Sequence, residues 1–152
     1  MATAAETPQA AVKEGPVVGR AVLVVDDSIS VRKLAARFLE SEGFEVETAV
    51  DGLDALEKLA QGKFRVVMTD LEMPRMHGYD LVEAIKSNPA FSNLPVIVCT
   101  SRSGEKHRRR ATEVGAEGYI TKPFSKEEII AEILRVTEWR GARPAEATGT
   151  TA

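Results

Sequence analysis

Five side chains that could do chemistry lie at the ends of short apolar segments of this 152-residue chain. They are Asp26, Asp27, Asp70, Thr100 and Lys122. Clustered carboxylates repel one another, and a hard divalent cation with a preference for oxygen ligands, such as Mg²⁺ or Mn²⁺, relieves that repulsion. A carboxylate can also attack phosphorus to form an aspartyl-phosphate, while an ammonium and a hydroxyl stabilise the charge on the transferred group. These residue types therefore indicate cation-dependent phosphoryl transfer.

Each of these residues taken alone has a simpler explanation. An Asp or a Thr after a strand is usually a turn or a helix cap, and a lone Lys is usually a solvated surface residue. A pair of acids directly after a fully apolar segment, as at Asp26-Asp27, is harder to explain as a cap. Because matching chemistry recurs at four segment ends, we favour one shared site over separate structural roles.

The apolar segments themselves predict β-strands. Three of them are short, continuous and β-branched, which is typical of strands buried on both faces; they span residues 21–25, 66–68 and 96–99. Residues 45–49 and 118–120 are weaker candidates, and we expect them nearer the sheet edges.

Apolar residues at helical spacing predict amphipathic helices between the strands. The stripes expected to pack on a sheet are Val31, Leu34, Ala35 and Phe38; Leu53, Leu56 and Leu59; Leu81, Val82 and Ile85; and Ile129, Ile130, Ile133 and Leu134. Ser125 with Glu128 indicates a capping box for the last helix. Residues 104–114 predict another helix, rich in charge and poor in apolar surface, which we expect to be the least well packed.

This alternation of strands and helices predicts an α/β fold, with a parallel sheet covered by helices on both faces. In such sheets the functional site lies beyond the carboxyl ends of the strands, where the five residues above would gather. We expect one domain over residues 19–140. Residues 1–18 and 141–152 should be disordered tails, because they have too little apolar surface to offset the entropy of ordering.

Composition and charge argue against several classes of protein. The net charge of -3 does not suit a nonspecific nucleic-acid binder, which needs a basic surface. Cys99 is the one cysteine, so no internal disulfide can form, and its apolar surroundings predict a buried thiol. No apolar run approaches the ~20 residues that span a bilayer, and the N-terminus lacks the pattern of a secretory signal. We expect a cytoplasmic protein that binds neither membranes nor nucleic acid.

The chain resembles the response-regulator receiver (CheY-like) family over roughly residues 20–138. The matching motifs are Val24-Val25-Asp26-Asp27-Ser28, Asp70-Leu71-Glu72-Met73-Pro74 with Gly78, Cys99-Thr100-Ser101, Gly115-Ala116 and Lys122-Pro123-Phe124. They are specific as an ordered set, although no single motif is. The resemblance implies a single flavodoxin-like (βα)₅ domain, a doubly wound parallel five-stranded sheet with strand order 2-1-3-4-5.

The resemblance also implies roles for individual residues. Asp70 would be the phosphoacceptor, and Lys122 and Thr100 would contact the phosphoryl oxygens. The implied ligands of the cation are Asp27 directly, Asp26 largely through water, Asp70, and the backbone carbonyl of Glu72. The peptide bond between Lys122 and Pro123 is expected to be cis.

Tyr119 matches the switch aromatic of the family. In that picture Thr100 moves toward the phosphoryl group, and Tyr119 turns inward to fill the space left behind. The alternative interpretation, a half-buried tyrosine on an edge strand, stays open at this point.

The chain departs from the common family pattern in two ways, one at His77 and one at Glu72 with Arg102. His77 replaces an acid in the segment Met73-Pro74-Arg75-Met76-His77-Gly78, and we interpret it as a loop residue rather than a phosphocarrier. Glu72 and Arg102 occupy positions that tune dephosphorylation in this family. We hypothesise that they set the phosphoryl lifetime here through a mutual ion pair.

The narrowest resemblance, over residues 26–33 and 100–108, is to receivers fused to chemotaxis-type (CheA) histidine kinases. The basic run His107 to Arg110 lies on the weakly packed helix. It is either a solvated face or a docking surface for an acidic partner. In this family the fourth helix, fifth strand and fifth helix form the usual partner face.

We therefore expect a two-component receiver that accepts a phosphoryl group from a histidine kinase or phosphotransfer domain and switches partner binding in chemotaxis or motility. It would catalyse its own phosphorylation and dephosphorylation without being a free-standing enzyme. The alternatives are a phosphate sink, a terminal receiver fragment of a hybrid kinase, and an aspartyl-nucleophile phosphohydrolase. The phosphohydrolase is disfavoured because such enzymes commonly carry Asp as an acid/base where this chain has Glu72. A pseudo-receiver that works by binding alone is disfavoured because the acidic cluster is intact.

Overall fold

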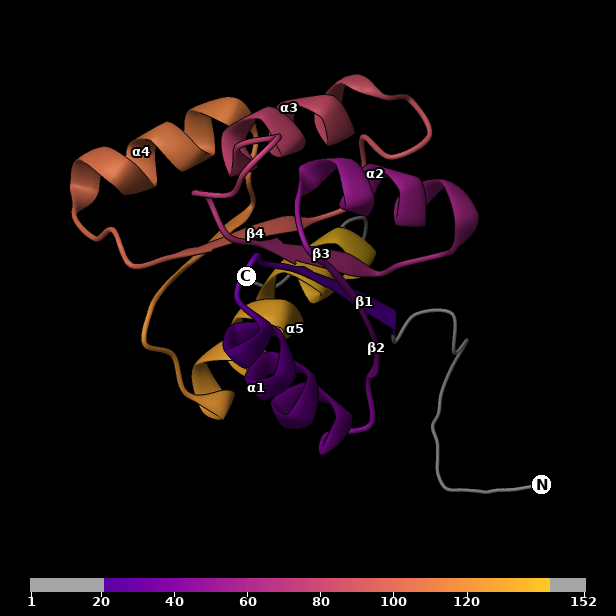
Figure 1. Cartoon of the computed structure of the whole chain (residues 1–152), viewed down its shortest axis with the longest axis vertical. Coiled ribbons are helices and arrows are strands. Elements are labelled where there is room, and N and C mark those ends of the chain that lie inside the picture. Colours follow the sequence, from indigo (N-terminus) through magenta and orange to yellow (C-terminus); the bar gives the residue numbers. More distant parts are fainter. Residues whose placement is uncertain (1–20, 143–152) are drawn as a thin grey trace.

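A computed structural model describes residues 21–142, with the side chains of residues 21–137 (Figure 1). Five strands alternate with five helices along this part of the chain, as predicted. In order they are β1 (Ala21–Val25), α1 (Ile29–Glu40), β2 (Glu45–Ala49), α2 (Gly52–Gln61), β3 (Val66–Thr69), α3 (Gly78–Ser87), β4 (Val96–Thr100), α4 (Glu105–Val114), β5 (Gly118–Thr121) and α5 (Lys126–Ala142).

The five strands form one parallel sheet in the order β2-β1-β3-β4-β5, which confirms the fold and strand order expected from the resemblance. In Figure 1, α1 and α5 cover one face of this sheet, and α2, α3 and α4 cover the other. The two weaker strand candidates, β2 and β5, are its edges. Because parallel strands point the same way, all five carboxyl ends lie along one edge of the sheet.

Two apolar clusters, one on each face of the sheet, account for the continuous apolar strands. In β1, Leu23 and Val25 belong to the cluster beneath α2 and α3, while Val22 and Val24 belong to the cluster beneath α1 and α5. Successive side chains of a strand point to opposite faces, so a strand between two helical layers must be apolar at every position. Cys99 is buried in the second cluster, as predicted, and burial raises the pKa of its thiol to about 12.

Side chains at the helix ends fix where the helices begin. The Ser28 hydroxyl accepts the Val31 N–H at the start of α1. The capping box predicted for α5 is present, because Glu128 N–H donates to the Ser125 hydroxyl and Ser125 N–H donates to the Glu128 carboxylate. By contrast, α4 begins at Glu105 after Gly104, which offers no side-chain cap, and Ala111 is its one buried residue.

Three leucines predicted to face the sheet are exposed instead: Leu34, Leu53 and Leu134. With 3.6 residues per turn, these positions lie about 100–160° around their helices from the buried Ala35, Ala55 and Ile129. At Leu34 and Leu53 the prediction was wrong because small residues occupy the centre of the buried faces of α1 and α2. Ala35 was part of the predicted face of α1, but Ala55 was not part of the predicted face of α2.

Helix α5 extends through Ala142, two residues past the predicted boundary at 140. The predicted tails, residues 1–18 and the rest of 141–152, lie outside the described residues. No helix in residues 21–142 is long and apolar enough to cross a membrane.

Candidate functional site

The strand ends bring three carboxylates together. Val25 of β1 lies opposite Thr69 of β3, and Asp70 N–H donates to the Val25 carbonyl at 2.8 Å, so that Asp26 and Asp70 are neighbours. Carboxylate oxygens of Asp26, Asp27 and Asp70 all lie within 4.8 Å of one another. The grouping predicted from the ends of the first and third strands is therefore present.

Lys122 connects this acidic group to the end of β5. Its Nζ lies 2.8 Å from Asp26 Oδ2 and 3.3 Å from Asp70 Oδ1. Its backbone N–H donates to the Thr100 carbonyl at 2.8 Å, which ties the end of β5 to the end of β4. The peptide bond between Lys122 and Pro123 is cis, as expected. Asp26 is 3% exposed and Asp70 is 9% exposed, so these charges meet in a largely dry place.

Burial and charge shift the pKa values at this edge in ways that favour a cation. Burial raises the pKa of the Asp70 carboxyl, the negative charge of Asp26 raises it further, and Lys122 opposes both. Burial lowers the pKa of the Lys122 ammonium, but its hydrogen bond to Asp26 and the charges of Asp26 and Asp70 outweigh that effect, so its pKa is raised. One ammonium therefore offsets three clustered carboxylates only in part. An additional positive charge would stabilise the ionised cluster.

Asp26 is held in place by contacts that the sequence did not reveal. Its Oδ1 accepts the Ser28 N–H at 2.9 Å, and its Oδ2 accepts from Lys122. The Arg32 guanidinium donates to the Asp26 backbone carbonyl at 2.7 Å. Because both carboxylate oxygens are engaged, Asp26 is oriented less freely than the exposed Asp27. Asp26 and Arg32 are six residues apart, and no standard sequence pattern predicts a contact at that spacing.

The loop after Asp70 depends on the glycine at position 78. Gly78 N–H donates to the Leu71 carbonyl at 2.7 Å, and a Cβ at this position would lie 2.2 Å from the Asp70 carbonyl oxygen. Any other residue would therefore push on the backbone of the candidate phosphoacceptor. The Thr69 hydroxyl also donates to the Asp70 carbonyl, at 2.8 Å.

Thr100 and Tyr119 are linked through Arg102. The Thr100 hydroxyl accepts the Arg102 N–H at 3.2 Å, and the Tyr119 hydroxyl donates to the Arg102 carbonyl at 2.7 Å. Burial raises the pKa of the Tyr119 hydroxyl, which keeps it a proton donor at neutral pH. The Arg108 guanidinium lies 4.9 Å from the centre of the Tyr119 ring. Tyr119 is thus half-buried on edge strand β5 and also bonded to the loop that follows Thr100.

Glu72 and Arg102 form the ion pair that we hypothesised, joining the loops after β3 and β4 beside the acidic cluster. Both side chains are about half exposed. His77, the other departure from the family pattern, caps α3: its Nδ1 accepts the Tyr79 N–H.

A second ion pair near the site was not predicted. Arg75, at a positive φ of 70°, makes two contacts with the buried Asp51 carboxylate, at 2.6 and 3.0 Å. The same carboxylate accepts the Asp54 N–H and caps α2. The hydrogen bond from Arg75 lowers the pKa of the Asp51 carboxyl and outweighs the opposing effect of burial. The sequence analysis predicted neither this cap nor a partner 24 residues away.

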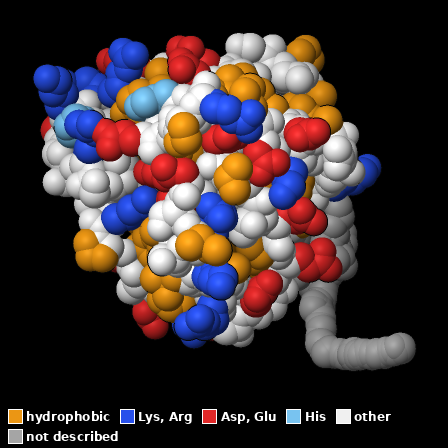
Figure 2. All heavy atoms as spheres, viewed as in Figure 1, with side chains coloured by type: hydrophobic (Ala, Val, Ile, Leu, Met, Phe, Trp, Pro, Cys, Tyr) orange, Lys and Arg blue, Asp and Glu red, His pale blue; other side chains and the backbone are white. Residues whose placement is uncertain are grey.

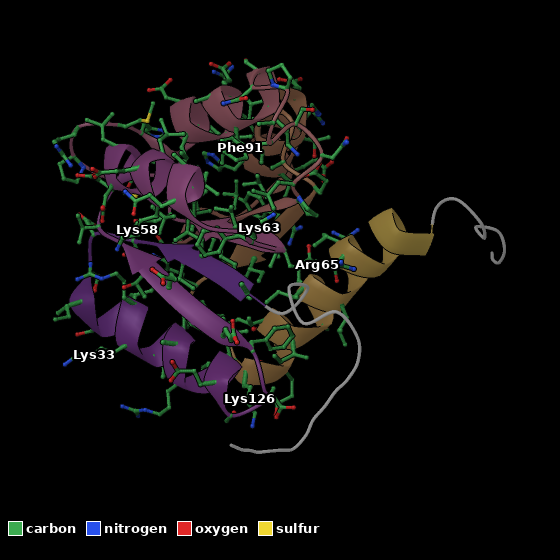
Figure 3. All side chains as sticks on the ribbon, turned by 90° about the vertical axis from the view of Figure 1, so that its right-hand side faces the viewer. Lys33, Lys58, Lys63, Arg65, Phe91 and Lys126 are labelled. Carbon is green, nitrogen blue, oxygen red and sulfur yellow. The ribbon has the colours of Figure 1, made fainter. Side chains whose placement is uncertain are left out.

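A hollow lies at the opposite edge of the sheet. It has a volume of about 420 Å³ and is lined by the loops before β3 and β4. Figure 3 labels three of its lining residues, Lys63, Arg65 and Phe91. None of the predicted site residues lines it, so the candidate site is not a deep substrate pocket.

The acidic cluster suits a hard divalent cation, because it offers carboxylate oxygens alone from three closely spaced residues. Asp70 is at the same time within reach of the Lys122 ammonium, which can neutralise negative charge on a group transferred to it. The cluster therefore has the parts needed for phosphoryl transfer to a carboxylate.

Comparison with known proteins gives a consistent picture. The sequence model of the protein family described as response regulator receiver domain matches residues 22–134 of this chain. Protein PilG of Pseudomonas aeruginosa is 42% identical over 115 residues, which are 76% of this chain and 85% of PilG. The chemotaxis response regulator CheY4 of Vibrio cholerae has a similar structure, with a TM-score of 0.73 at 36% identity, covering 76% of this chain and 97% of CheY4.

Longer proteins match over one part of their length. Residues of this chain cover 52% of the transcriptional regulatory protein CpxR homolog of Haemophilus influenzae, at 39% identity. They cover 8% of hybrid signal transduction histidine kinase D of Dictyostelium discoideum, at 34% identity. The matched region, the strand order and the acidic strand ends agree, and the chain therefore belongs to the response regulator receiver domain family of two-component signalling, which is not a classical enzyme family.

Proposed function

We propose that this receiver accepts a phosphoryl group on Asp70 from a histidine kinase or phosphotransfer domain, and that the modification changes its binding to a partner protein. The observation that carries the proposal is the convergence of Asp26, Asp27, Asp70 and Lys122 at one edge of the sheet. The histidine-containing donor is suggested by the family and by the match to a hybrid kinase.

The residues would divide the work as follows. An Asp70 oxygen forms a bond to phosphorus while the bond from phosphorus to the donor breaks. Lys122 and the Thr100 hydroxyl would contact the phosphoryl oxygens and offset their charge. Mg²⁺ or Mn²⁺ would be held by Asp27, by Asp26 largely through water, by Asp70 and by the Glu72 carbonyl. When bound, the cation would neutralise the acids and polarise the transferred phosphoryl group.

The proposed output runs through α4, β5 and α5. Thr100 would shift toward the phosphoryl group, and its bond to Arg102 N–H together with the bond from Tyr119 to the Arg102 carbonyl offers a route from the site to β5. Tyr119 would thereby act as the switch residue. The similarity to PilG and CheY4 supports a place in chemotaxis or motility and, with the free thiol Cys99, a cytoplasmic location.

A phosphate sink or a receiver fragment of a hybrid kinase remains the second candidate, supported by the match to a hybrid kinase. A phosphohydrolase acting on outside substrates is less well supported, because Glu72, the residue that would serve as acid/base, is paired with Arg102. Hydrolysis would then be confined to the protein's own acyl phosphate.

Acetyl phosphate with Mg²⁺ tests this proposal directly. We expect intact mass spectrometry to show one phosphoryl group on the wild type and none on Asp70→Asn. Chelation of the cation with EDTA should also prevent phosphorylation, because the ionised cluster then lacks its counter-charge. Exposed Asp80, on α3, provides a matched control: Asp80→Asn should be phosphorylated like the wild type. Equal phosphorylation of Asp70→Asn and the wild type would overturn the proposal.

A further inference from the structure

A basic hollow lies between the start of α3 and the outer face of α4. Its volume is about 310 Å³, and its walls are Tyr79 of α3 with Lys106, His107, Arg109, Arg110 and Glu113 of α4. We refer to these six residues as the α3–α4 surface. This surface faces away from β5 and α5. The neighbouring Arg108 points the other way, and its guanidinium lies over the ring of Tyr119 on β5. The basic run of the sequence is thus divided between two faces of one helix.

The cations of this surface form no ion pair in the part of the chain that the structure describes, and Glu113 is the one carboxylate among the six residues. Lys106, Arg109 and Arg110 take part in no ion pair within residues 21–137, whereas the guanidinium of Arg135 and the ammonium of Lys122 are paired with carboxylates. Figure 2 shows the corresponding concentration of Lys, Arg and His side chains over α4, at the upper left. This concentration occurs in a chain whose net charge is -3.

The position of Lys106 is unfavourable for α4 itself. Lys106 lies in the first turn, next to Glu105, where the positive end of the helix dipole repels a cation. Arg109 and Arg110 lie near the middle of the helix, and the last turn carries no basic residue. The helix also lacks a side-chain cap at Gly104 and buries Ala111 alone. A partner that brings negative charge to this end would remove the repulsion and stabilise α4 at the same time.

Tyr79 gives the surface a fixed shape. The Arg110 guanidinium lies 5.5 Å from the centre of the Tyr79 ring, and the Tyr79 hydroxyl donates to the His107 carbonyl at 3.5 Å. A planar guanidinium held against a ring is oriented for paired hydrogen bonds to a carboxylate. Lys106, Arg109 and Arg110 are spaced i, i+3 and i+4, so they lie on one face of the helix.

The arrangement suits acidic side chains better than nucleic acid. The three cations of this surface fall well short of the roughly 6–10 phosphate contacts typical of a protein that binds DNA, and the acidic remainder of the chain would repel a polyanion. An acidic helix with carboxylates at i and i+4 has the same spacing as the cations.

We propose that the α3–α4 surface docks an acidic helical segment of a partner protein. This inference rests on the proposed function, because it names the chemistry of the partner that the receiver would engage. It adds a binding face distinct from the one formed by α4, β5 and α5. Arg109 and Arg110 supply the main contacts.

Fluorescence anisotropy tests the proposal with a labelled helical peptide of about 18 residues, or five turns, that carries Glu at i, i+4 spacing. The double variant Arg109→Glu/Arg110→Glu should bind this peptide at least about tenfold more weakly than the wild type, because two attractive contacts become repulsive. A Gln version of the peptide should not bind. Circular dichroism checks that the variant is folded, and Arg109→Gln/Arg110→Gln should show a smaller loss in the same direction.

Lys63→Glu/Arg65→Glu is the matched control, since it changes the net charge equally at the basic hollow on the opposite edge of the sheet. Less than a twofold loss is expected there. An equal loss in both double variants, no binding of the acidic peptide to the wild type, or tighter binding of single-stranded DNA of similar length would each overturn the proposal. Asp70→Asn should bind the peptide as the wild type does, so a failure at Asp70 and a failure at the α3–α4 surface are separable.

Discussion

Arg102 joins the two residues of the proposed switch: its backbone carbonyl accepts the Tyr119 hydroxyl, and its backbone N–H donates to the Thr100 hydroxyl. Its guanidinium also pairs with Glu72. A change at the phosphorylation site that moves Thr100 would therefore be felt at Arg102. The Glu72 carboxylate thus lies beside the acidic cluster but is held by the Arg102 guanidinium.

The lifetime of the acyl phosphate should depend on this pair. In Arg102→Ala the Glu72 carboxylate is released and can accept a proton from an attacking water, so we expect dephosphorylation to be several-fold faster, well below the roughly 10²–10⁴-fold effect of a fully positioned base. Loss of the phosphorylated mass over time measures the rate. Adding Glu72→Gln to Arg102→Ala should abolish the gain. Unchanged rates in the single variant would end this explanation.

The sequence predicted the main site residues because strand ends of a parallel sheet must share an edge. Asp26, Asp70 and Lys122 meet there for that reason. The sequence could not predict the contact of Arg32 with Asp26 or the pairing of Asp51 with Arg75. Those contacts depend on the path of loops rather than on a local pattern. Asp51 and Arg75 show this most clearly, since they join the loop after β2 to the loop after β3.

At the scale of elements, the Asp51–Arg75 pair should make stability depend on pH. The folded-state pKa of Asp51 is lowered, mainly by the hydrogen bond from Arg75. The contribution of Asp51 is therefore complete above its unfolded pKa of about 3.9 and is lost as the pH falls through the lower folded value.

We expect Asp51→Asn to unfold at a lower urea concentration than the wild type at pH 7, because Asn can still cap α2 but cannot pair as a charge. The difference should shrink steadily as the pH is lowered below about 3.9. Asp80→Asn, which removes an exposed carboxylate on α3, controls for the loss of negative charge. If the difference in unfolding urea concentration between Asp51→Asn and the wild type stayed constant at every pH below that value, the proposed role of the Asp51–Arg75 pair would be contradicted.

Strands and helices were predictable to different degrees. The apolar segments of β1, β3 and β4 could be identified because both faces of these strands are covered, so no polar residue interrupts them. The helices were located correctly, and Ala35 was placed on the buried side of α1, but Leu34 and Leu53 were wrongly included and the buried Ala55 of α2 was missed. Close approach of a helix to a sheet favours small residues, and hydrophobic spacing alone does not show this.

At the scale of the whole molecule, strand order came from resemblance to a family rather than from local patterns, because periodicity predicts elements and not their neighbours. That order places the acidic cluster at the carboxyl ends of central strands β1 and β3. It also places the loop from Thr100 to α4 between the cluster and the α3–α4 surface. One loop thus connects the end of β4, at the acidic cluster, to the helix that carries the α3–α4 surface.

The most direct test of the central claim is to identify the phosphorylated atom. After treatment with acetyl phosphate and Mg²⁺, the label should be removed by neutral hydroxylamine, which cleaves acyl phosphates and leaves phosphate esters of Ser and Thr intact. The hydroxylamine adduct should be found by peptide mass spectrometry at Asp70. A label that resists hydroxylamine, or an adduct at Asp26 or Asp27 instead, would contradict the account.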